Sequence, residues 1–66
     1  MIKVRILELE EEMEIVTNLP EIPKKDDQIC CFFNFDDFRV CNIISIRYFL
    51  LNTGEFNEVE IGVLAC

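Results

Sequence analysis

The second half of the sequence is dominated by two runs of β-branched, aliphatic and aromatic residues, Val40–Leu51 and Phe56–Leu64. Residues of these types are enriched in β-strands, and runs this dense favour a sheet. The turn-forming segment Asn52–Glu55 separates the two runs and includes Gly54, which can adopt positive φ at no steric cost. The sequence therefore predicts an all-β fold built around a long hairpin.

Three shorter strands and a loop are expected before this hairpin. Ile2–Ile6 alternates apolar and charged residues with period two, and Met13–Thr17 fits a short strand that returns antiparallel. A helix over Leu7–Val16 stays open as an alternative, because Glu, Leu and Met are strong helix formers. Two prolines place a loop over Asn18–Lys25, and a third strand is expected from about Asp27 to Asn34.

The alternation also predicts which side chains face the interior. The expected interior positions are Ile29, Cys31, Phe33, Phe38, Val40, Ile44, Ile46, Tyr48, Leu50, Val59, Ile61 and Val63. The long fourth strand is expected to kink at Asn42 or Ser45 and to serve both halves of the sheet. These 66 residues are expected to form one domain, residues 1–66, in which a five-stranded antiparallel meander makes a small, partly closed, SH3-like barrel.

Net charge limits the partners of the chain. It carries 13 acidic and 6 basic side chains, a net charge of −7. A surface of this sign repels nucleic acids and anionic membranes, so direct binding to either is not expected. No apolar segment approaches the ~18 residues of a transmembrane helix, and Met1–Leu9 lacks the apolar core of a signal peptide. We expect a cytoplasmic protein whose four cysteines are thiols.

Side chains that carry chemistry are scarce. The chain has no histidine, and Ser45 is its only serine, so neither an activated nucleophile nor a general acid–base pair is indicated. The adjacent Cys30 and Cys31 point to opposite faces of a strand, and with Cys41 and Cys66 they lack the spacing of a zinc site. Cys66 is instead a candidate for an exposed, reactive thiol. These features predict a non-enzymatic protein without a cofactor.

Large apolar side chains are left on the outward side of the predicted barrel. We expect an interaction face formed by Phe32, Ile43, Phe49, Leu51 and Leu64. A small barrel cannot enclose all of them, and contiguous exposed apolar surface usually marks an interface. The leading hypothesis is therefore a module that self-associates or docks on a partner protein. If the register past Ser45 differs from the expected one, part of this set belongs to the core instead.

The densest charge cluster supports an alternative hypothesis. As an extended strand, Glu8, Glu10, Glu12 and Glu14 project to one side, with Glu11 among them. Such a row either discourages strand addition as a solvated edge or docks on lysine and arginine side chains. In the second case the protein is an acidic inhibitor or decoy that occupies the basic groove of a nucleic-acid-processing enzyme.

Part of the sequence resembles a known group of proteins. Leu19–Ile29 has the form L-P-x-I-P-x-x-x-D-x-I, followed by Phe38-x-Val40 and by the V-x-I-x-V of Val59–Val63. Over Leu19–Val63 this resembles an uncharacterised group of short bacterial and phage-borne proteins with an SH3-like small barrel, in which L-P-x-x-P-x-x-G-D-x-I leads into a strand. Asp26 stands where that group has glycine, and Phe38-Arg39-Val40 is one residue shorter than the usual spacing. The resemblance implies a small-barrel fold and no activity.

Overall fold

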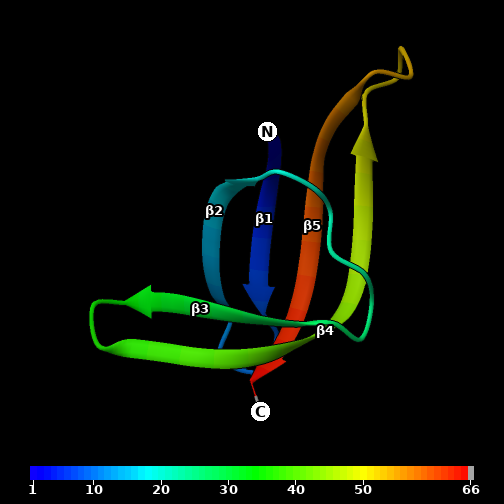
Figure 1. The fold of residues 1–66 in the computed structure, drawn as a ribbon. Helices are drawn as coiled ribbons and strands as arrows, with labels where there is room; N and C mark the ends of the chain where they lie inside the picture. The colour runs from blue at the N-terminus through cyan, green and yellow to red at the C-terminus, as the bar shows by residue number, and fades with distance from the viewer. Residues whose placement is uncertain (66) are drawn as a thin grey trace.

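The computed structural model describes residues 1–65, which form five strands in one sheet that curls into a nearly closed barrel (Figure 1). The strands are β1 (Ile2–Glu8), β2 (Met13–Leu19), β3 (Gln28–Asn34), β4 (Asp37–Leu50) and β5 (Phe56–Ala65). No helix occurs within residues 1–65, so the helical alternative for Leu7–Val16 is wrong. The all-β, barrel-shaped fold predicted from the alternation is confirmed.

The strand order is β2-β1-β5-β4-β3, which differs from a meander at one point. β1 pairs antiparallel with β2 but parallel with β5, so that Val4 lies opposite Val59 and Ile6 opposite Ile61. β1 and β5 therefore lie inside the sheet. β2 and β3 form its two edges; they come close to each other but are not hydrogen-bonded neighbours.

β4 belongs to both halves of the sheet. Its first part pairs with β3 and its second part with β5. The register with β5 shifts between Ile43 and Ser45, which leaves Ile44 as an extra residue, and the strand bends strongly along its length (Figure 1). Extra residues of this kind form β-bulges, which bend the strand that carries them. The kink expected near Ser45 is confirmed.

The bulge decides which side chains of β4 face the core. Cys41 and Ile43 precede it and are fully buried, whereas Phe38, Val40 and Ile44 are all more than one-third exposed. The prediction that Phe38, Val40 and Ile44 point inward is wrong, because an unbroken period of two ignores the extra residue. Ile43, which was predicted to lie on the outward apolar face, is a core residue for the same reason.

The core lies between the central strands and the bent part of β4. Its buried members are Val4, Ile6, Cys31, Cys41, Ile43, Val59, Ile61 and Val63. The inward positions predicted in β3 and β5 are confirmed, since Ile29 and Phe33 pack against these residues. Full burial of each aliphatic side chain contributes about 1.5–3 kcal/mol, which makes this cluster the main source of stability.

The end of the β4–β5 hairpin extends past the strands that cover the core and forms an arm (upper right in Figure 1). Pairing of β5 with β1 begins only at Val59. Tyr48 and Leu50, predicted to be interior, are therefore 58% and 61% exposed. Their strand continues beyond the layer that would bury them. Gly54 in the turn has φ 87°, which confirms the positive φ expected there.

The loop between β2 and β3 is tied to the bulged part of β4. The Asp26 N–H donates to the Ile43 carbonyl at 3.0 Å, and the Lys24 N–H donates to Asp27 Oδ2, also at 3.0 Å. Asp26 has φ 74°. Aspartate is one of the few residue types besides glycine that tolerate this left-handed region. Asp26 thus adopts a backbone conformation that favours glycine.

Candidate interaction surface

β3 has backbone groups that point away from the sheet. The Asp27 carbonyl accepts from the Ile43 N–H of β4 at 2.9 Å, immediately before β3 begins. Along an antiparallel strand, the N–H and C=O groups of successive residues point alternately to the two sides of the strand. Asp27 and every second residue after it therefore turn these groups toward β4. Cys30 and Phe32 lie between those positions and turn theirs toward the open edge. β3 therefore offers donors and acceptors to an additional strand.

The side chains of β3 do little to block such pairing. Its sequence, Gln-Ile-Cys-Cys-Phe-Phe-Asn, contains no charged residue and no proline. Natural sheets usually protect their edges with charged side chains, proline or bulges. β3 has one such feature, a register shift between Phe32 and Asn34 close to its end. The regular stretch Gln28–Phe32 has none.

The outer face of the β3–β4 hairpin is apolar. Cys30 lies opposite Val40, and Phe32 lies opposite Phe38 with ring centroids 4.9 Å apart. Phe32, Phe38 and the turn residue Phe35 are 66%, 50% and 100% exposed. At about 200 Å² per aromatic side chain, these three rings alone expose roughly 400 Å², as much as the largest patch on a typical monomer. We name these five residues the Phe32–Phe38 patch.

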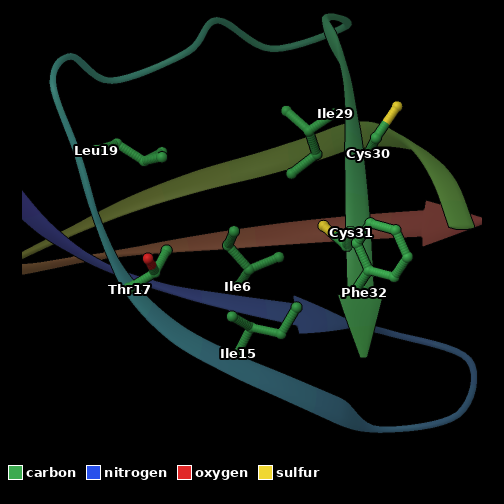
Figure 2. A pocket seen from close by; sticks show the side chains of 8 residues that line it. All are labelled: Ile6, Ile15, Thr17, Leu19, Ile29, Cys30, Cys31 and Phe32. Carbon is green, nitrogen blue, oxygen red and sulfur yellow. The ribbon is translucent and has the colours of Figure 1, made fainter. Parts of the chain in front are cut away.

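A cleft opens between the two edge strands, which cross at a steep angle (Figure 2). Its volume is ≈ 460 Å³, and its lining residues are Ile6, Ile15, Thr17, Leu19, Ile29, Cys30, Cys31 and Phe32. Ile6 and Cys31 belong to the core, so the cleft reaches the interior of the barrel. Burial raises the pKa of the Cys31 thiol to about 11, with smaller contributions from Cys41 and Cys30. This thiol is therefore protonated and unreactive at neutral pH.

The structure divides the predicted apolar face. Phe32 is exposed on β3, whereas Phe49 and Leu51 are exposed at the arm, near the other end of β4. Leu64 is only half-buried. The ring of Phe49 lies beneath the Arg5 guanidinium, whose carbon is 6.0 Å from the ring centroid. Phe32 is thus the one predicted residue that lies in the Phe32–Phe38 patch.

The predicted acidic edge also needs correction, because Glu8 is fully buried. β1 pairs with β2 in unbroken register up to Glu8, so the side chains of Val4, Ile6 and Glu8 share the inward face. The Glu8 carboxylate accepts hydrogen bonds from the backbone N–H groups of Glu10 and Glu11, at 3.0 and 2.8 Å. These bonds, aided by Arg39 and opposed by burial, hold the pKa of Glu8 below its usual value.

Arg39 neutralises further carboxylates near this end of the barrel. Its guanidinium contacts Asp37 at 2.8 Å, Glu11 at 2.6 Å and Glu8 at 3.9 Å. Hydrogen bonds to Asp37 and Glu11 raise the pKa of Arg39 above its ordinary value. Three members of the predicted edge, Glu10, Glu12 and Glu14, remain exposed without an ion pair among residues 1–65.

Other kinds of site find no support in the part of the chain that is described. No group of three acidic or cysteine side chains within residues 1–65 is placed to hold a metal ion. The same residues contain no helix able to cross a membrane. Cys66, the candidate reactive thiol, lies outside the described residues. The sequence matches no protein-family model, and comparison with curated proteins and with solved structures found no match.

Proposed function

We propose that the protein is a non-enzymatic interaction module that self-associates through β3 and the Phe32–Phe38 patch. The observation that supports this most directly is the position of β3, an uncharged edge strand with an apolar patch on one side and an apolar cleft on the other. A protein that works by contact needs a surface of this kind, and the largest apolar patch on a protein surface is often functional.

The distribution of charge allows a second copy of the chain to be the partner at this surface. Two molecules of net charge −7 repel each other over most of their surfaces. β3 carries no charge, so two copies can meet there without bringing carboxylates together. A contact between identical patches also closes naturally around a two-fold axis, which is the commonest symmetry of soluble oligomers.

Exposed area supports the same proposal. The accessible surface is 4714 Å², whereas a compact monomer of 7.8 kDa exposes roughly 4,400 Å². A stable interface buries about 800 Å² per partner. The three patch phenylalanines supply roughly half of that area. The contact therefore has to use the open edge or the cleft as well.

The acidic-decoy alternative has less support. It needs a continuous row of available carboxylates, but Glu8 is buried and Glu11 is bound to Arg39. Of those that remain, Glu10 and Glu12 lie in the turn between β1 and β2 and Glu14 lies in β2, so they do not form one row.

Light scattering coupled to gel filtration tests the proposal. The unmodified protein should run as a dimer that does not weaken between about 0.05 and 0.5 M salt, because salt screens the repulsion between the two acidic copies and leaves the apolar contacts unchanged. Phe32→Asp should give a folded monomer. Phe56→Asp, which places the same charge on the exposed arm, is the matched control and should remain dimeric. A strict monomer at high concentration contradicts the proposal, and dissociation by Phe56→Asp alone would place the interface on the arm.

A further inference from the structure

We propose that two copies join by antiparallel pairing of their β3 edges, with Cys30 of one copy opposite Cys30 of the other. The sheet of one molecule then continues into the sheet of the second. This inference rests on the proposed function and specifies its geometry: hydrogen bonding between edges, in place of face-to-face packing of the Phe32–Phe38 patches.

The backbone restricts the register of such a pair. By the same alternation Gln28, Cys30 and Phe32 turn their backbone groups toward the open edge, so a symmetric ladder can place Cys30 opposite Gln28, Cys30 or Phe32 of the second copy. The register shift beyond Phe32 ends the regular part of the strand. Cys30 is the middle of the regular stretch Gln28–Phe32, and only a two-fold axis at Cys30 lets each copy use that whole stretch.

The cleft gives the added strand an apolar place to lie. A strand paired to β3 runs about 4.8 Å from it, over the mouth of the cleft between β3 and β2. In the proposed register Ile29 lies opposite Cys31 of the second copy, and both residues line the cleft. The pairing thus covers Ile15 and Leu19 on the opposite wall as well. This supplies the apolar area that the Phe32–Phe38 patch alone lacks.

A pair of substitutions at Cys30 tests the edge directly. Cys30→Pro removes an N–H that points to solvent and blocks the approach of another strand, while the ladder between β3 and β4 keeps its bonds. Cys30→Val preserves the N–H and the apolar surface. Sedimentation equilibrium should show at least a ~100-fold weaker dimer for the proline variant and a change of less than about threefold for the valine variant.

Phe38→Asp distinguishes failure of this inference from failure of the proposed function. If Cys30→Pro remains dimeric while Phe38→Asp is monomeric, the copies pack face to face: the edge inference is overturned and the proposed function stands. If the unmodified protein is monomeric at every concentration, both are overturned.

Cross-linking gives a second readout that does not depend on the proline variant folding. Directly opposed residues in a hydrogen-bonded antiparallel pair have Cα atoms about 5.5 Å apart, within the range that a disulfide spans. In a Cys66→Ser background, copper–phenanthroline removes two electrons and two protons from two Cys30 thiols and should yield a covalent dimer. Replacing Cys30 by serine and exposed Val16 by cysteine should abolish it; equal cross-linking through residue 16 would overturn the register.

Discussion

Truncation of Ile43 and of its neighbour Ile44 tests the bulge in β4, the feature that decides which side chains form the core. Ile43 is fully buried, and Ile44 is 38% exposed. Ile43→Ala removes three carbon atoms from the centre of the core and leaves a cavity, at a cost of about 2–5 kcal/mol. Ile44→Ala removes the same atoms from a partly solvated position. It should cost less than about 1 kcal/mol, since surface substitutions have small effects.

The expected loss at Ile43 is large for a domain of this size. At about 0.05–0.15 kcal/mol per residue, 66 residues give roughly 3–10 kcal/mol of total stability. The alanine variant is therefore close to unfolding, so Ile43→Val and Ile44→Val should be measured beside it. Ile43→Val should cost about 0.5–1.5 kcal/mol, and each kcal/mol lowers Tm by about 4–8 °C.

Thermal and urea unfolding followed by circular dichroism provide the measurement. All variants need one protein concentration, because self-association stabilises the folded state by mass action. Equal losses at the two positions, or a larger loss at Ile44, would refute the bulge and with it the assignment of Ile43 to the core.

Three other substitutions or conditions test local features. Glu8 has a lowered folded-state pKa, so its stabilising contribution is present above pH 4.5 and is lost as pH falls through the folded value; Glu8→Gln should flatten acid unfolding in that range. A Cβ on Gly62 would lie 2.5 Å from the Ser45 hydroxyl oxygen, so Gly62→Ala should cost about 1–3 kcal/mol and Ser45→Ala should restore part of it. In a thiol titration at pH 8 of the Phe32→Asp variant, which should be monomeric, exposed Cys30 should react at once and buried Cys31 only after denaturant is added.

The order and approximate length of the strands could be predicted from the sequence because each strand has a strong local signal. Alternation marks β1 and β2, prolines mark the loop after β2, and Gly54 marks the last turn. β5 shows the clearest case, where Val59, Ile61 and Val63 alternate with polar residues or glycine and are all fully buried. At these positions the local sequence pattern agrees with the final packing. The period-two alternation alone therefore predicts which side chains are buried.

The interior of β4 could not be predicted in the same way. A bulge changes the parity of a strand, and its position depends on the partner strand rather than on the sequence around Ile44. Tyr48 and Leu50 show a second limit, because alternation gives the direction of a side chain and not the extent of the layer that covers it. Parallel pairing of β1 with β5 is a long-range property that no local pattern reports.

Glu8 shows why an acidic residue can occupy an inward position. Glu8 carries the same side chain as its exposed glutamate neighbours. Its carboxylate, however, accepts hydrogen bonds from two backbone N–H groups of the tight turn that follows β1, in place of a backbone carbonyl. A buried carboxylate with hydrogen-bond donors and a nearby arginine avoids the desolvation penalty of an unpaired charge. An inward Glu at the last position of a strand, directly before a turn, is the sequence signal that points to this role.

Arg39 connects this buried carboxylate to the proposed interface. It lies on β4, directly opposite Cys31 of β3, and its guanidinium reaches Glu8 at the end of β1 and Glu11 in the following turn. The β3–β4 hairpin is therefore anchored across the end of the first hairpin rather than alongside β2. Because the hairpin crosses β2 at a steep angle, β2 and β3 form no ladder with each other, and both edges remain open on either side of the cleft. The ion-paired cluster thus holds the β3–β4 hairpin at one end of the barrel in an orientation in which β3 forms no ladder with β2.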